Sequence, residues 1–246
     1  MNMNLQIIRL NNESLKSLHD GDSTRAFFLL MEAWRLTNRH SNNRDAVRRN
    51  EANVVTFCTW EGDIRQNCFS LVCEESCEFR FFLRPARVMQ EGILKASTPK
   101  LKFEDIAGVI TYNLAIAITI LGMKAPGGKG SLLFSKAYRL FHSVACRHGS
   151  QELATLFSPT STPDEAMNLK GNFFLTMTTI CLSNQACLSF WLEKYDNSRT
   201  CLLQLKCILA EARNQGRDLL DDGDKKILYQ NLILLLAQSP TVAAAA

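Results

Sequence analysis

The sequence predicts an all-α fold of stacked helical hairpins with one small β-hairpin insertion, in a single domain over residues 1–246. Helix breakers are scarce. The 246 residues include only 12 Gly and 6 Pro, which together are about 7% of the chain, whereas the average combined share is about 12%. Apolar residues recur three and four positions apart through most of the chain, which is the period of an amphipathic helix. These helical stretches come in pairs joined by short turns, and such pairs pack antiparallel.

The first hairpin is predicted over residues 5–37, with its turn at His19-Asp-Gly-Asp22. Gly21 is suited to a left-handed C-cap, and Asp22 or Ser23 can cap the next helix. The other predicted helical elements are a hairpin over 103–147 (helices 103–121 and 131–147), a hairpin over 163–215 (helices 163–193 and 196–215), a C-terminal helix over 224–238 and a tail over 239–246.

The region between the first two hairpins differs in composition. Residues 37–53 are rich in Asn, Arg and Ser and are predicted to form a solvated linker. Residues 54–89 are rich in β-branched and aromatic residues and are predicted to hold the insertion, a β-hairpin with strands over 68–72 and 78–83. Pro85 restricts any continuation of the second strand.

Composition and charge exclude several classes of partner. Hydrophobic residues make up 46% and charged residues 21%, which is typical of a folded globular chain. The net charge of +4 is far from the concentrated basic field that binds phosphate backbones, so no nucleic-acid partner is expected. The N-terminus lacks the features of a secretory signal, and nine cysteines show no disulfide pattern. The expected location is cytoplasmic, with a nuclear location left open.

Two uncharged apolar runs, residues 106–121 and 227–237, raise the question of a membrane. Both are shorter than the roughly 20 residues that span a bilayer. A helix that is apolar nearly all round is also expected at the centre of a helical stack. No membrane partner is therefore predicted, and attachment through 106–121 is kept as a third possibility.

No catalytic or metal site is predicted. His142 and His148 lie six residues apart, unlike the spacings of zinc fingers or helical metalloproteases. One cysteine cluster lacks the paired knuckles of a structural zinc site. It consists of Cys58, Cys68, Cys73 and Cys77. No nucleophile elbow occurs either, so we expect no catalytic residue, no metal and no cofactor.

Residues 122–131 supply the alternative hypothesis, a nucleotide-binding protein or enzyme that uses a glycine-rich loop and Lys129. The segment follows an apolar run and precedes a helix, as a phosphate-binding loop does. However, Met123 stands where that motif needs its first glycine, and Gly130 stands where it needs a hydroxyl. The favoured interpretation is a plain loop over 122–130.

The three hairpins share a repeat pattern, with an Asn in the first helix, a short turn, and alternating small and large apolar residues in the second helix. The shared Asn residues are Asn12, Asn113 and Asn184. With Leu10-Asn-Asn12, Asn113-Leu-Ala115 and the Ala-rich end, this pattern resembles the tetratricopeptide-like helical repeats, and more narrowly a group of poorly characterised diatom proteins of that kind. The 54–89 insertion fits no repeat.

The resemblance implies a tetratricopeptide-like α-α superhelix, in which first helices form a concave groove. It also implies that Asn12, Asn113 and Asn184 line this groove, where some family members bond peptide backbone or a terminal carboxylate. A hydrogen bond between hairpins is the alternative role of each Asn. The resulting hypothesis is a non-catalytic scaffold that binds a protein or peptide partner, as an extended segment or helix, in the groove. The sequence leaves the oligomeric state open.

Overall fold

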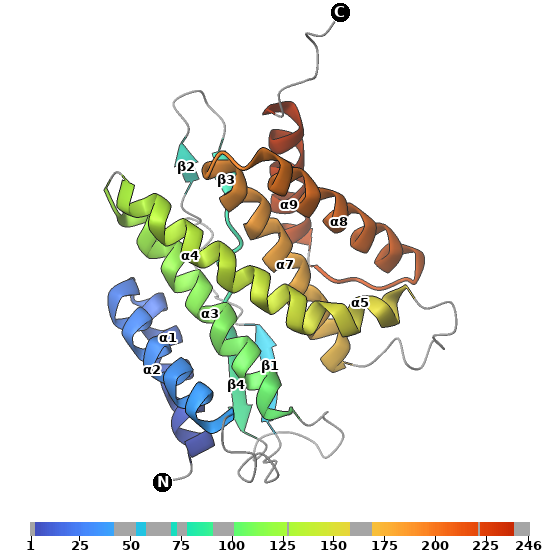
Figure 1. The fold of residues 1–246 in the computed structure, drawn as a ribbon. Coiled ribbons are helices and arrows are strands. Elements are labelled where there is room, and N and C mark those ends of the chain that lie inside the picture. Colours follow the sequence, from blue (N-terminus) through green and yellow to red (C-terminus); the bar gives the residue numbers. More distant parts are fainter. Residues whose placement is uncertain are drawn as a thin grey trace, which may run out of the picture.

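The protein is mostly helical, as the sequence predicts (Figure 1). A computed structural model describes residues 3–41, 53–57, 70–72, 78–90, 101–126, 128–157, 169–220 and 222–238. The helices are α1 (Met3–His19), α2 (Ser23–Ser41), α3 (Phe103–Lys124), α4 (Gly128–Val144), α5 (Ser150–Leu156), α7 (Leu169–Trp191), α8 (Tyr195–Asn214) and α9 (Asp222–Gln238), with a π-helical turn at Ala145–Gly149. The strands are β1 (Asn53–Phe57), β2 (Ser70–Val72), β3 (Glu78–Arg80) and β4 (Ala86–Gln90).

Six helices pack as three hairpins, α1 with α2, α3 with α4 and α7 with α8 (Figure 1). The second helix of one hairpin also packs against the first helix of the next, α2 on α3 and α4 on α7. In the first turn, Gly21 has a φ of 81°, as a left-handed C-cap requires. The carboxylate of Asp22 accepts a hydrogen bond from the backbone N–H of Arg25 at 2.9 Å, so both predicted caps of this turn are confirmed.

The two central helices are buried on most sides. Within the described residues, Phe103–Lys124 and Gly171–Trp191 are long and apolar enough to cross a membrane. Their most apolar windows are 72% and 83% buried inside the protein, and core helices of globular proteins share this composition. Packing between neighbouring hairpins therefore accounts for the apolar run at 106–121.

The predicted start of the linker at residue 37 is wrong, because α2 continues to Ser41. Thr37 is buried, and its hydroxyl donates to the carbonyl of Ala33 at 2.7 Å. This bond satisfies a polar side chain inside the helix, where composition alone indicated solvent.

The helix predicted over 131–147 also differs at both ends. It begins at Gly128 and changes at Ala145 into a π-helical turn, which continues into α5. Two glycines allow the π-helical turn to pack closely against α3 and α7. An added Cβ on Gly108 would lie 2.0 Å from Nε2 of His148, and one on Gly149 would lie 2.8 Å from Cγ2 of Thr178. The π-helical turn thus brings a bulky ring against a glycine of α3.

The predicted β-hairpin is present. Strands β2 and β3 pair antiparallel, with Ser70 opposite Arg80, although β3 ends before the predicted residue 83. Its turn lies outside the described residues. A second, unpredicted antiparallel pair joins β1 to β4, with Asn53 opposite Gln90. Pro85, which has no N–H to donate, directly precedes β4.

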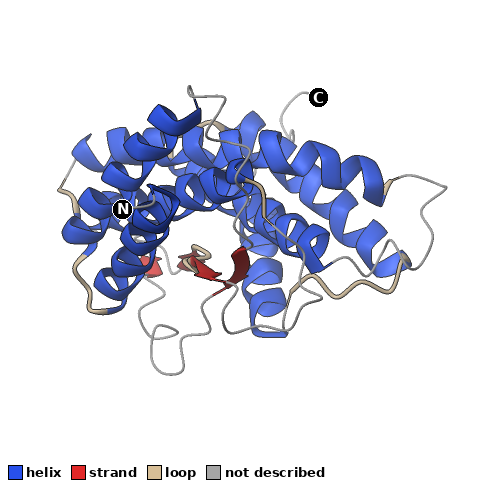
Figure 2. Cartoon of the chain, turned by 90° about the horizontal axis from the view of Figure 1, so that it is seen from below, coloured by secondary structure: helices blue, strands red, loops and turns tan. Residues whose placement is uncertain are grey.

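The helices form an arch, and the strands lie beneath it (Figure 2). Strand β4 contacts α1 and α3, while β3 contacts α9. The chain that joins β3 to β4 therefore passes along the inner side of the helical array.

Candidate functional site

An extended segment of the chain is enclosed by the first helices of the hairpins. We call residues 81–88 the inner segment. Phe81 and Phe82 are 1% and 3% exposed, and Ala86 and Val88 are fully buried. Five side chains from α1, α3 and α7 bond its backbone, and together we call them the cradle. The cradle consists of Asn11, Asn12, Tyr112, Asn113 and Asn184.

Asn184 of α7 bonds both backbone groups of Phe82. Its Oδ1 accepts the N–H of Phe82 at 2.8 Å, and its Nδ2 donates to the carbonyl of Phe82 at 2.9 Å. Asn184 is fully buried, so each bond satisfies a polar group that has no access to water. The carboxamide thus acts as a peptide group of a neighbouring strand would.

Asn113 of α3, the first helix of the neighbouring hairpin, makes the same pair of bonds. Its Oδ1 accepts the N–H of Ala86 at 2.8 Å, and its Nδ2 donates to the carbonyl of Ala86 at 2.7 Å. The same Nδ2 donates to Oδ1 of Asn11 at 2.8 Å, and Asn11 donates to the Ala86 carbonyl at 3.4 Å. Asn113 therefore bonds the backbone of this chain's own inner segment and also Asn11 of a neighbouring hairpin.

Single hydrogen bonds complete the cradle. Nδ2 of Asn12 donates to the carbonyl of Val88 at 2.8 Å, and the hydroxyl of Tyr112 donates to the carbonyl of Arg84 at 2.7 Å. The bonded residues of the inner segment are 82, 84, 86 and 88. In an extended chain, backbone groups two residues apart face the same side, so one edge of the segment faces the cradle throughout.

Two side chains of the inner segment have specific neighbours in the helices. The guanidinium of Arg84 forms an ion pair with the carboxylate of Asp224 in the first turn of α9, and their side chains are 25% and 15% exposed. The ring of Phe81 stacks on Phe134 of α4, with centroids 6.3 Å apart. The site therefore includes one ion pair and one aromatic contact besides its hydrogen bonds to backbone groups.

The structure brings the three sequence-predicted residues Asn12, Asn113 and Asn184 around one segment. Sequence reasoning missed Asn11, Tyr112 and Asp224. Asn11 and Tyr112 are immediate neighbours of predicted residues, and that adjacency was the available signal. Asp224 is the first residue of the predicted C-terminal helix, and its contact with a residue 140 positions away has no local signature.

The glycine-rich run of the alternative hypothesis is mostly helical, so the predicted loop over 122–130 is wrong. Helix α3 continues to Lys124 and α4 begins at Gly128. A Cβ on Gly130 would lie 2.9 Å from the carbonyl oxygen of Gly122, so these glycines allow two helices to approach. Lys129 is exposed in the first turn of α4.

The described histidines and cysteines are scattered. Exposed His142 lies with its Nε2 3.6 Å from Sγ of Cys146, whereas His148 is buried and stacks on Phe174. Cys187 is buried, and burial raises the pKa of its thiol to about 12. No three His, Cys, Asp or Glu side chains of the described residues form a metal-binding group. The predicted cysteine cluster lies outside those residues.

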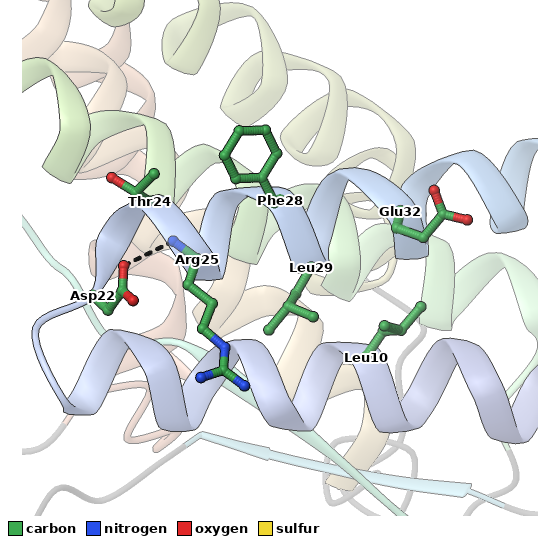
Figure 3. Close-up of a pocket in the computed structure, with 7 residues that line it drawn as sticks. All are labelled: Leu10, Asp22, Thr24, Arg25, Phe28, Leu29 and Glu32. Carbon is green, nitrogen blue, oxygen red and sulfur yellow. Dashed lines mark hydrogen bonds between the residues drawn. The ribbon is translucent and has the colours of Figure 1, made fainter.

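A separate shallow hollow of about 460 Å³ lies on the first hairpin, which stands in front of the other helices in Figure 3. It shares no residue with the cradle. The carboxylate of Asp22 at its edge is engaged by the backbone of Arg25. The lining residues are Leu10, Asp22, Thr24, Arg25, Phe28, Leu29 and Glu32.

Comparison with known proteins identifies no relative. No protein-family model matches the chain, and no curated protein or solved structure is significantly similar to it.

Proposed function

We propose that this protein is a non-catalytic interaction scaffold that binds an extended segment of a partner protein through the cradle. The observation that supports the proposal is the paired bonding of two buried asparagines, Asn184 with Phe82 and Asn113 with Ala86. In this proposal the inner segment occupies the site that a partner would use.

The chemistry of the carboxamide suits this role. It presents one acceptor and two donors, and an extended residue presents its own N–H and C=O on one side. The match does not depend on the side chain of the bound residue. A surface whose amides bond every second or fourth residue of an extended chain can therefore bind many sequences. The edge strand of a β-sheet binds added peptides in the same way.

We propose that the stacked hairpins form a tetratricopeptide-like superhelix. The contacts of α2 with α3 and of α4 with α7 repeat the step from one hairpin to the next, and the repeated asparagines lie on the first helices. Such arrays leave a concave wall of first helices, and Asn12, Asn113 and Asn184 come from three successive first helices, α1, α3 and α7.

A partner must compete with the inner segment, because a tethered segment has an effective concentration on the order of millimolar. The test therefore uses the full chain with R84E, which places a carboxylate against Asp224 and weakens the hold on the tethered occupant. A fluorescein-labelled peptide with the sequence of residues 78–90 is titrated into this variant, and its fluorescence anisotropy is measured.

We expect saturable binding to R84E and at least tenfold weaker binding when N184A is added, because two backbone bonds are lost. N197A is the matched control, since Asn197 is exposed on α8 away from the cradle, and it should leave binding unchanged. Circular dichroism establishes that each variant is folded. Equal peptide binding with and without N184A, or none to folded R84E, would overturn the proposed function.

A further inference from the structure

The side chains of the inner segment indicate which partners the cradle would accept, an inference that rests on the proposed function. Within the inner segment, the asparagine amides bond backbone groups and no side chain, so they do not discriminate among sequences. Selectivity must come from positions where a side chain of the segment meets a specific helical residue. Two positions of the inner segment have such a contact, Phe81 and Arg84, and the full burial of Ala86 limits the size of the side chain there.

The position of Arg84 selects charge. Its guanidinium is paired with Asp224, and both side chains are largely removed from water. Asp224 lies in the first turn of α9, where the helix dipole favours a carboxylate. A neutral or acidic side chain at this position would lose the partly buried ion pair with Asp224, which is unfavourable.

The other two positions select size. The ring of Phe81 is 1% exposed and stacks on Phe134, so this position favours an aromatic side chain. Ala86 is fully buried, and Asn113 and Asn11 both donate to its carbonyl. Because Ala86 is fully buried, a larger side chain at this position would overpack the site.

We propose that the partner of the cradle is an extended polypeptide segment with an aromatic residue, a basic residue three positions later and a small residue two positions after that. Asp224 is the residue that selects the basic position. The partner is a protein segment of the same chemical pattern as residues 81–88, and it enters by replacing them.

The test is a charge-reversal matrix of four full-length proteins and two peptides. The proteins are wild type, R84E, D224K and the double variant, and the labelled peptides carry the sequence of residues 78–90 with either Arg or Glu at the position of Arg84. Affinities are measured by fluorescence anisotropy. R84E should bind the Arg peptide at least tenfold more tightly than the Glu peptide, and D224K should show the opposite preference.

The double variant is the matched control. Its tethered segment regains an ion pair of reversed polarity, so it should bind both peptides as weakly as wild type does. If the single variants bind both peptides equally, the charge selection is wrong and the proposed function survives. If no folded variant binds either peptide, the proposed function itself is wrong.

Milder substitutions serve if circular dichroism shows that a charge-reversed protein is unfolded. R84Q should prefer the Arg peptide over a Gln peptide at least fivefold, and D224N should lose that preference. Equal preference in R84Q and D224N would overturn the role of Asp224.

Discussion

The carboxamide of Asn113 bonds both backbone groups of Ala86, accepting its N–H at 2.8 Å and donating to its carbonyl at 2.7 Å. The two residues are 27 positions apart, and both are fully buried. Water cannot replace the amide at this depth, so these two bonds contribute to the stability of the fold.

The cradle residues should contribute to stability in proportion to the buried groups that each satisfies. N113A removes partners from the N–H and carbonyl of Ala86 and from Asn11, and we expect it to lower the free energy of unfolding by about 3–5 kcal/mol. N12A removes a half-buried bond to Val88 and a longer one from Asn11, and it should lower the free energy of unfolding by about 1 kcal/mol. Urea denaturation followed by circular dichroism measures both.

An aspartate at position 113 separates the donor role of the Asn113 amide from its acceptor role. N113D keeps an acceptor for the N–H of Ala86 but places carboxylate oxygens against the Ala86 carbonyl and Oδ1 of Asn11. We expect N113D to be at least as destabilised as N113A at neutral pH. A loss for N113D no larger than that for N12A would contradict the two-bond geometry.

The sequence predicted the helical pairing because the three-and-four spacing of apolar residues is local information. It could not predict the inner segment, whose bonds join Phe82 to Asn184 and Val88 to Asn12 across 102 and 76 positions. The segment also lacks the alternation of a half-buried strand, since Phe81 and Phe82 are consecutive and both buried.

The glycine-rich run illustrates a second limit of local reasoning. Gly122 and Gly130 are the two ends of the predicted loop, yet both lie inside helices. A Cβ on Gly122 would lie 2.7 Å from the ring of Phe134, so tertiary packing explains this glycine and overrides its low helix propensity. Composition cannot distinguish a glycine that forms a loop from a glycine that lets two helices pack closely.

Gly108 gives a prediction that reverses the usual effect of replacing glycine in a helix. Helix propensity alone favours alanine by about 1 kcal/mol. At this position the new Cβ would lie 2.0 Å from Nε2 of His148, and that ring is buried and stacked on Phe174 with centroids 4.8 Å apart. We expect G108A to lower the free energy of unfolding by about 2–3 kcal/mol, measured by urea denaturation.

The matched control for G108A is G128A, because a Cβ on Gly128 meets nothing within 4 Å. G128A should be neutral or slightly stabilising. A double-mutant cycle with H148A identifies the cause, since removing the ring should abolish most of the cost of G108A. Equal losses for G108A in the presence and absence of His148 would contradict the proposed collision.

Buried thiols predict how stability depends on alkaline pH. Desolvation by burial raises the pKa of Cys187 from its ordinary value of 9.0 to about 12. The folded state therefore retains this proton above pH 9 while the unfolded state releases it. The stabilisation is fully present below pH 9 and decreases by about 1.4 kcal/mol per pH unit above it, until the folded thiol also ionises.

The variant C187A should lose this part of the pH dependence. It is expected to be less stable than wild type at pH 8 because of the cavity it creates, but its further loss between pH 8 and pH 10.5 should be about 2 kcal/mol smaller. Urea denaturation under reducing conditions at the two pH values measures the difference. C207A removes an exposed thiol of α8 and should follow the wild-type pH dependence. Parallel pH curves for wild type and C187A would show that the thiol at position 187 reaches water in the folded protein.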